Sequence, residues 1–251
     1  MALRPLICAE DDARTTNDPL LRVLPRRAEA TAQVFLRYLG DGRLPWPTQS
    51  QPKAVRTALA EWRRVSETGL EREAETVVRE AGLSARGRVT PSKARTVGLS
   101  LSGEIDVLAV DLSRRRIWVL ECKHLHEPFS PPEIASRLTD VYGTAVLRGT
   151  DEGVRPRQSI DRSRAAIGRL ASKTDDIRGN VESAVALVAG IAATDRDPVA
   201  WQVTPVMVTG HVEAAAFSVA PEVCWVAIRN LGNLLQASDV PEPGWWVPWR
   251  H

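Results

Sequence analysis

Apolar residues recur at helical spacing between residues 54 and 81. The spacing predicts helices over 54–67 and 70–81, with Gly82 as the C-terminal cap of the second. Gly69 stands between them, so the pattern fits two helices or one helix broken at this glycine.

Three segments of strand character come next, at 86–90, 104–110 and 117–123. The link over 111–116 is short and polar. We therefore expect the second and third segments to form an antiparallel hairpin.

The later half of the chain alternates between helical and strand patterns. Helices are predicted from Pro131 onward, then over 159–173, 180–193 and 230–236, and strands over 201–208 and 223–228. The segment 180–193 is also compatible with a buried strand, and Pro205 suits an edge strand or an irregular one. This order of elements predicts an α/β protein with a mixed sheet.

The pattern divides the chain into three parts. Residues 1–66 form an arginine-rich helical region that ends with a proline-rich loop and the first predicted helix, 67–236 form the α/β domain, and 237–251 form a Pro/Trp-rich tail. The tail holds three tryptophans, which are too much apolar area to leave in water. We expect the tail to pack on the body of the protein or to meet a partner.

Composition narrows the class of protein. With 251 residues, 43% hydrophobic residues and a net charge of +2, the chain can bury a sizeable core and is not a disordered tail. It lacks a membrane-spanning apolar stretch and a secretory signal, and its three cysteines fit neither a disulfide framework nor a zinc knuckle. We expect a cytoplasmic protein with no membrane partner.

Charged residues interrupt the predicted hairpin at one end. Glu121 and Lys123 share one face of their strand, whereas Cys122 faces the other way and is predicted to be core. Asp106 stands on the partner strand, where pairing can bring it near Glu121. Charges at the end of an apolar strand are costly unless they are paired or bind a metal ion, so the alternatives are a structural ion pair and a metal site.

Two neighbouring carboxylates favour a metal site. They repel each other unless a cation is present, and oxygen ligands suit Mg²⁺ or Mn²⁺ rather than zinc. Such an ion activates water and polarises a phosphoryl oxygen, while Lys123 can hold or deprotonate the water. This is chemistry for phosphodiester hydrolysis.

This charged motif resembles the PD-(D/E)XK nuclease superfamily. Asp106 is followed by fourteen residues and then Glu121-Cys122-Lys123, within a G-x-I-D-V-L segment and a V-x-E-x-K strand. The resemblance covers about 67–230 and implies a restriction-endonuclease-like αβββαβ core. It also implies that Asp106 and Glu121 bind one or two Mg²⁺ (or Mn²⁺) ions with the main-chain carbonyl of Cys122, and that Lys123 is the catalytic lysine. Ile105 departs from the proline of the family pattern.

The superfamily also has a glutamate on the preceding helix. Glu71, Glu73 and Glu75 are candidates for this role. Glu71 borders the apolar stripe of the helix and is the first choice, with Glu75 second.

Arginines beside the strands are candidate phosphate contacts. They are Arg86, Arg88, Arg114, Arg115 and Arg116. The alternative is a solvated charged face. A second copy of the chain or a protein partner is also expected to bind through 1–66 or the tail.

The expected function is a metal-dependent nuclease, with DNA favoured over RNA and an endonuclease of restriction, repair or defence type favoured by the resemblance. One alternative is a catalytically silent nuclease-fold module that binds nucleic acid or serves as a scaffold. Another is an unrelated α/β domain in which the three residues match by accident.

Overall fold

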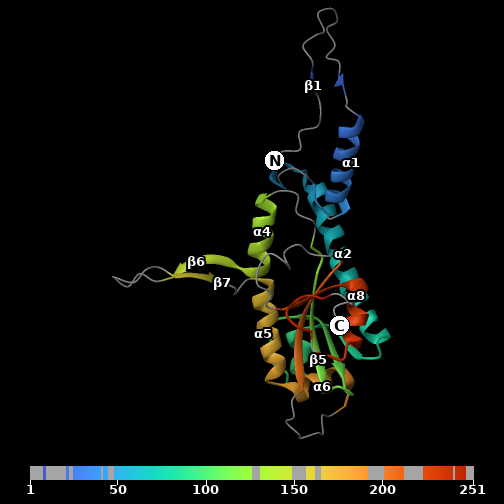
Figure 1. The fold of residues 1–251 in the computed structure, drawn as a ribbon, viewed down its shortest axis with the longest axis vertical. Helices are drawn as coiled ribbons and strands as arrows, with labels where there is room; N and C mark the ends of the chain where they lie inside the picture. The colour runs from blue at the N-terminus through green and yellow to red at the C-terminus, as the bar shows by residue number, and fades with distance from the viewer. Residues whose placement is uncertain are drawn as a thin grey trace, which may run out of the picture. The chain divides into compact units, whose positions relative to one another are not determined.

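The computed structural model describes most of the chain (Figure 1). The described residues are 8–9, 21–22, 25–40, 42–44, 48–125, 131–148, 157–161, 165–191, 201–211, 223–239 and 241–246. The chain divides into two compact units, Met1–Ser66 and Glu67–His251. The first unit ends at the residue where the sequence pattern places the end of the arginine-rich region.

The first unit is mainly helical in its described residues. It contains the antiparallel pair β1 (Cys8–Ala9) and β2 (Leu21–Arg22), helix α1 (Pro25–Gly40), the 3-10 turn η1 (Thr48–Ser50) and the start of α2 (Lys53–Glu80). Proline suits the first turn of a helix, as at the start of α1. The Trp62 indole N–H donates to the carbonyl of Gly40 at 2.9 Å, which ties α2 to the end of α1.

Helix α2 is continuous through Gly69, so the prediction of a break there was wrong. A glycine in a helix costs about 1 kcal/mol relative to alanine. Burial of Leu70, Ala74 and Val78 directly after it offsets this cost. Gly82 ends the helix with a φ of 84°, which confirms the predicted cap.

The second unit is built on a six-stranded mixed sheet, in the order β10-β9-β8-β5-β4-β3. Strands β3 (Ser84–Val89), β4 (Ile105–Asp111) and β5 (Arg116–Lys123) are antiparallel. Strands β8 (Gln202–Thr209), β9 (Cys224–Ala227) and β10 (Gly244–Trp245) extend the sheet in parallel from β5. The predicted α/β class, mixed sheet and β4–β5 hairpin are confirmed.

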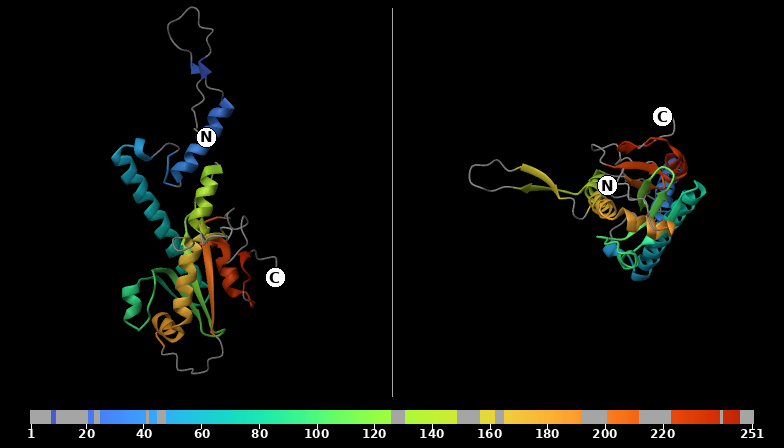
Figure 2. Two further views of the ribbon diagram at one scale, coloured as in Figure 1. Left: turned by 90° about the vertical axis from the view of Figure 1, so that its left-hand side faces the viewer. Right: turned by 90° about the horizontal axis from the view of Figure 1, so that it is seen from below.

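Helices cover both faces of this sheet (Figures 1 and 2). Helices α5 (Ala166–Arg178) and α6 (Val181–Ala189) pack on one face, and the second half of α2 packs with α8 (Ile228–Gln236) on the other. On β5, Ile117 and Val119 point to the first core, while Trp118, Leu120 and Cys122 point to the second. Cys122 is 7% exposed, so its predicted place in the core is confirmed.

The second unit also contains the helices α3 (Pro91–Arg95) and α4 (Pro131–Tyr142). The side chain of Thr90 accepts a hydrogen bond from the Lys93 N–H at 3.3 Å and caps α3. The helix predicted from Pro131 is confirmed.

Some elements differ from the sequence pattern. Strands β6 (Thr144–Arg148) and β7 (Arg157–Asp161) form a separate antiparallel pair, so α5 begins at Ala166 rather than at 159. Pro205 lies in β8, which is a central strand. Pairing of β8 with β9 starts only at Val206. Pro205 therefore lies where β8 is paired on one side only, and its missing N–H breaks no hydrogen bond to β9.

The described part of the tail packs on the body. Strand β10 pairs with β9, the Trp246 N–H donates to the Trp225 carbonyl at 2.8 Å, and Trp246 is 7% exposed. Trp249 lies outside the described residues. Among the helices that are described, none has the length and apolar character needed to cross a membrane.

Candidate functional site

The ends of β4 and β5 bring the predicted carboxylates to one face. Val107 pairs with Leu120, so Asp106 comes opposite Glu121. Asp106 shares the face of Leu108 and Val110, the face to which Val119 of β5 also points. An Asp106 carboxylate oxygen accepts a hydrogen bond from the Cys122 main-chain N–H at 2.7 Å. The side chain thus binds the backbone of β5 just beyond the last paired residues.

Glu121 is buried between two ammonium groups. The residue is 2% exposed, Lys123 Nζ lies 2.8 Å from its Oε1, and Lys173 Nζ lies 2.6 Å from its Oε2. Burial raises the pKa of Glu121, but the two lysines outweigh burial and hold the pKa below its usual value. Burial lowers the pKa of Lys123, but Glu121 and Asp106 together outweigh burial and raise that pKa. The pair is therefore ionised at neutral pH.

The pKa of Asp106 is raised, whereas that of Glu121 is lowered. Burial and the charge of Glu121 raise the pKa of Asp106 to about 6, against the opposing effects of Lys123 and the Cys122 N–H. A carboxylate that is buried beside another carboxylate is stabilised by any additional cation. Asp106 is therefore the acid in this cluster that gains most from such a cation.

The helical glutamates take three different environments. Glu75 accepts a hydrogen bond from the Gly87 N–H at 2.9 Å and pairs with Arg79 at 2.6 Å, so it joins α2 to β3. Glu73 is exposed. The side chain of Glu71 is 20% exposed, and its Oε2 is buried without a hydrogen-bond partner.

Glu71 belongs electrostatically to the same cluster. Burial raises the pKa of Glu71, and the charges of Arg88 and Lys123 oppose that effect. Its charge also contributes to the raised pKa of the Cys122 thiol. The first choice from the sequence is thus the helical glutamate that lies beside the β5 residues.

In the β3–β4 pair, Arg88 lies opposite Asp106, because Gly87 pairs with Val107 and Val89 pairs with Ile105. Its Nε lies 3.1 Å from Glu104 Oε1 and 3.8 Å from Glu71 Oε2, and its side chain is 60% exposed. Its φ of 50° is rare for a residue with a side chain and costs about 1–2 kcal/mol. Arg88 is the candidate arginine placed beside the carboxylates with part of its guanidinium open to solvent.

Three of the predicted phosphate contacts donate hydrogen bonds to carbonyls within the protein. Arg86 donates to the carbonyl of Leu187 at 2.9 Å, at the end of α6. Arg114 donates to the carbonyls of Leu235 and Gln236, and Arg116, which is 8% exposed, donates to those of Ala237, Ser238 and Asp239. These arginines cap helix C-termini, where cations satisfy the last carbonyls.

The hairpin arginines are also far from the carboxylates. Residues 114–116 lie at the start of β5, and Glu121 lies at its end, about 17 Å away at the rise of an extended strand. The assignment of Arg86, Arg114 and Arg116 as phosphate contacts therefore stays a prediction for a surface away from these carboxylates. Arg115 lies at the same hairpin turn with a φ of 51°.

Lys173 joins the cluster although the sequence pattern did not predict it. It lies on the buried stripe of α5, with Ala166, Ile167, Leu170, Thr174 and Ile177. A lysine at a core position of an amphipathic helix is the signal that points to it, because such a charge needs a buried partner.

The donor set suits a hard divalent ion. The second oxygen of Asp106, the Glu121 carboxylate, the Cys122 carbonyl and Glu71 Oε2, which accepts no hydrogen bond, are all oxygen ligands. Within the described ranges, no group of three or more His, Cys, Asp or Glu side chains has the geometry of a metal site. A metal ion here would need the main-chain carbonyl and water as further ligands, as is usual for Mg²⁺.

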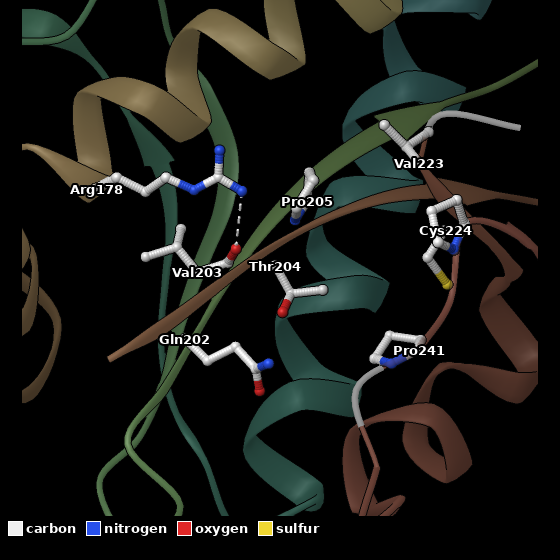
Figure 3. Close-up of a pocket in the computed structure, with 9 residues that line it drawn as sticks. Arg178, Gln202, Val203, Thr204, Pro205, Val223, Cys224 and Pro241 are labelled. Atoms are coloured by element: carbon white, nitrogen blue, oxygen red, sulfur yellow. Dashed lines mark hydrogen bonds between the residues drawn. The ribbon is translucent and has the colours of Figure 1, made fainter. Parts of the chain in front are cut away.

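A separate cavity lies at the other end of the sheet (Figure 3). Its volume is about 440 Å³, and it is lined by Arg178, Gln202, Val203, Thr204, Pro205, Val223, Cys224, Pro241 and Pro243. It borders the first half of β8, whereas Glu121 pairs with Met207 in the second half. The cavity is therefore not part of the charged cluster.

The class of protein is defined by the fold and this cluster. No family model matches the sequence, and no curated protein and no solved structure matches the chain. The fold and the site define a mixed α/β protein with a six-stranded sheet and a buried carboxylate–lysine cluster at the ends of β4 and β5.

Proposed function

We propose that this protein is a metal-dependent hydrolase of phosphodiester bonds, a nuclease of the PD-(D/E)XK type. One observation carries the proposal: Asp106 lies opposite Glu121-Cys122-Lys123 at the end of β4 and β5. The elements α2, β3, β4, β5, α5 and β8 support it, because they follow the αβββαβ order of the superfamily that the sequence resembles, with α3, α4, the β6–β7 pair and α6 inserted between them.

The chain's oxygen donors would hold Mg²⁺ or Mn²⁺. Asp106, Glu121 and the Cys122 carbonyl would be the direct ligands, and Glu71 would support the site through its Oε2, which accepts no hydrogen bond. The bound ion supplies a Lewis acid for the phosphoryl oxygen and a water of lowered pKa. The raised pKa of Asp106 supports this assignment, because burial and Glu121 leave that carboxylate short of positive charge.

Lys123 acts as a cation rather than as a base. Burial lowers the pKa of Lys123, but Glu121 and Asp106 together raise it by more, so the ammonium persists at neutral pH. It therefore orients water and stabilises negative charge on the phosphate through its remaining N–H groups. Of the two roles that the sequence left open for Lys123, holding water and deprotonating it, the proposal adopts the first.

Arg88 supplies the phosphate contact closest to the carboxylates. Its guanidinium is largely exposed and pairs with Glu104 on one side. A nucleic-acid backbone needs such donors for positioning. DNA remains the favoured substrate, and cytoplasmic defence, repair or restriction remains the favoured biological role. Both preferences rest on the resemblance to the PD-(D/E)XK superfamily.

The test is cleavage of supercoiled plasmid by the purified full chain with Mg²⁺ or Mn²⁺. Metal-dependent nicking that is lost in Asp106→Ala and Lys123→Ala supports the proposal. Asp175→Ala is the matched control, because that carboxylate is exposed on α5 and pairs with Arg178 on the same helix. Absence of nicking by the wild-type chain with either ion and with linear, nicked and single-stranded substrates overturns the proposal.

One observation favours a second candidate, a catalytically silent module that binds nucleic acid. Both oxygens of Glu121 already accept a lysine, so the carboxylate is neutralised without a metal ion. In that case the chain binds DNA with an affinity that EDTA does not change. Metal-dependent nicking excludes this candidate.

A further inference from the structure

The cavity of about 440 Å³ lies along the edge of β8 that faces away from β5 (Figure 3). Residues 202–209 of β8 all pair with β5, whereas the pairing of β8 with β9 begins only at Val206. The first half of β8, residues 202–205, therefore has no described strand on its other side. At the rise of an extended strand this open edge is about 13 Å long, and each of its residues lines the cavity.

The main-chain groups of Val203 point to this open edge. The Gln202 N–H donates to the Arg115 carbonyl at 2.9 Å, toward β5. Successive residues of a strand direct their main-chain groups to opposite sides in a parallel ladder, so the N–H and C=O of Val203 point away from β5. The Arg178 guanidinium donates to the Val203 carbonyl at 3.4 Å, which agrees with this direction. The Val203 N–H has no described β9 residue opposite it.

Thr204 presents a buried hydroxyl to the cavity. The residue is 6% exposed, and no described residue forms a hydrogen bond with its hydroxyl, although buried hydroxyls are nearly always bonded. Its oxygen is not sealed by protein atoms, unlike the indole N–H of Trp118, which pairs with Thr204 across the ladder. A ligand in the cavity can therefore reach this hydroxyl.

Arg178 adds a positive charge on the other side of β8 from Thr204 (Figure 3). Its side chain is 54% exposed and pairs with Asp175 on the same helix at 2.9 Å. An exposed pair of this kind is weak, and the guanidinium has further N–H groups to donate. Among the described residues that line the cavity, none is acidic. The cavity therefore favours a ligand with a negative group, and a single planar guanidinium matches one carboxylate.

The remaining walls of the cavity are apolar. They are formed by Val203, Pro205, Val223, Pro241 and Pro243. A ligand here needs a carboxylate, an apolar body and a carbonyl that pairs with the open edge of β8. The carboxyl-terminal residues of an extended peptide combine these features, and proteins bind peptides both by adding a strand to a sheet edge and by capturing the terminal carboxylate. Gln202 is partly exposed and Pro243 is exposed, so the rest of the peptide can leave the cavity beside them.

We propose that this cavity binds the carboxyl-terminal end of an extended peptide. The carboxylate of the peptide lies between the Arg178 guanidinium and the Thr204 hydroxyl, and a peptide carbonyl accepts a hydrogen bond from the Val203 N–H. Glu121 pairs with Met207, in the other half of β8, so the carboxylate–lysine cluster is not part of this site. The inference does not rest on the proposed function, and the failure of one leaves the other standing.

The test compares free and blocked carboxylates. An array of short synthetic peptides that differ in their last residues is made twice, once with free carboxylates and once with terminal amides, and is probed with the labelled full chain in EDTA. The affinity of the strongest binder is then measured by fluorescence anisotropy. The same residues as an N-acetylated single amino acid serve as the competitor that has the carboxylate but no extended chain.

Two variants test the side chains of the site. Arg178→Met keeps the apolar stem without the charge, and Thr204→Val keeps the shape without the hydroxyl. Arg95→Met is the matched control, because Arg95 is an exposed arginine of α3, which follows the edge strand β3. Since the Thr204 hydroxyl has no partner within the described protein, Thr204→Val should leave the thermal midpoint unchanged or raise it. Thermal unfolding also measures whether Arg178→Met is folded.

We expect binding that the terminal amide weakens by about tenfold, with a loss of about tenfold in Arg178→Met, about threefold in Thr204→Val and none in Arg95→Met. An array with no carboxylate-dependent binder overturns the inference even when Arg178→Met does not fold. Unchanged affinity in both a folded Arg178→Met and Thr204→Val also overturns it, because the peptide then binds elsewhere. A single N-acetylated amino acid that binds as tightly as the peptide overturns it too, and assigns the cavity to small organic acids.

Discussion

The carboxylate of Asp106 accepts a hydrogen bond from the main-chain N–H of Cys122 at 2.7 Å, across the ends of β4 and β5. This contact fixes the acid against the strand that holds Glu121 and Lys123. It also places the carboxylate in a buried position beside a second carboxylate, where burial and Glu121 raise its pKa to about 6. The contact thus links the hairpin register to the electrostatics of the site.

Replacing Asp106 by asparagine should stabilise the chain at pH 8 in EDTA. The amide oxygen keeps the Cys122 hydrogen bond, and the buried charge is removed. A pKa of about 6 against the ordinary 3.8 corresponds to a gain on the order of 2–3 kcal/mol in the free energy of unfolding. Urea unfolding measures this difference.

The difference in the free energy of unfolding between the wild type and Asp106→Asn should depend on pH. The folded chain holds its Asp106 proton more tightly than the unfolded chain, so the destabilising contribution is absent below about pH 4, grows as the pH rises and is complete above about pH 6. The two chains should therefore be equally stable near pH 4. An Asp106→Asn chain that is less stable than the wild type at pH 8 would show that the pKa of Asp106 is not raised.

Adding Mn²⁺ should reverse the order of the two chains. An ion that binds only the folded state stabilises it by about 4.1 kcal/mol when present at a thousandfold excess over its dissociation constant, which exceeds the advantage of the asparagine. We expect the thermal midpoint of the wild type to rise with Mn²⁺ and to fall again with EDTA, while Asp106→Asn changes little. Equal shifts in both chains would place the ion elsewhere.

Substitutions of Arg116 and Arg88 should have different effects, the first on stability and the second on DNA binding. Arg116→Met leaves three carbonyls after α8 without their donor, so we expect a loss of about 2–4 kcal/mol in urea unfolding and unchanged DNA affinity in the folded chain. Arg88→Ala should change stability by less than about 1 kcal/mol and reduce the salt dependence of DNA binding by about one phosphate contact. Fluorescence anisotropy at several salt concentrations checks the binding, and the reverse pattern would reassign both residues.

Gly87 should be intolerant of alanine because of Glu75. A Cβ at Gly87 would lie 2.5 Å from Glu75 Oε2, so the carboxylate must move and weaken its bond from the Gly87 N–H. We expect Gly87→Ala to lower the free energy of unfolding by about 1–2 kcal/mol, and by less when Glu75 is already alanine. A double-mutant cycle measures this difference. Gly69→Ala is the contrasting control: with nothing within 4 Å of its Cβ in a helix, it should stabilise by about 0.5–1 kcal/mol. Equal effects in both glutamate backgrounds would assign the cost to the backbone.

The sequence predicted the part of the fold that depends on local patterns. The continuous apolar runs of β4 and β5 and their short polar link predict the hairpin, and the register of the structure brings Asp106 opposite Glu121. The pairing of β6 with β7 was missed because the apolar residues from 159 to 173 also fit a helical period, which hid the start of α5 at Ala166.

Long-range contacts account for the remaining differences. Arg114 and Arg116 look like a basic patch in the sequence, and only the packing of α8 beside the hairpin turn shows that they bind carbonyls. Lys173 likewise has no local signal for its partner, because Glu121 lies 52 residues away on another element. Side chains that pair across elements cannot be assigned from spacing alone.

That separation of 52 residues has a consequence for how the protein is made. During synthesis, β4 and β5 leave the ribosome well before α5, so the early chain has Asp106, Glu121 and Lys123 but neither Lys173 nor the helix that covers them. The carboxylate pair then stays hydrated and lacks its fixed geometry. The cluster is completed only when α5 docks on the sheet, so an incomplete chain lacks the finished arrangement of carboxylates and lysines.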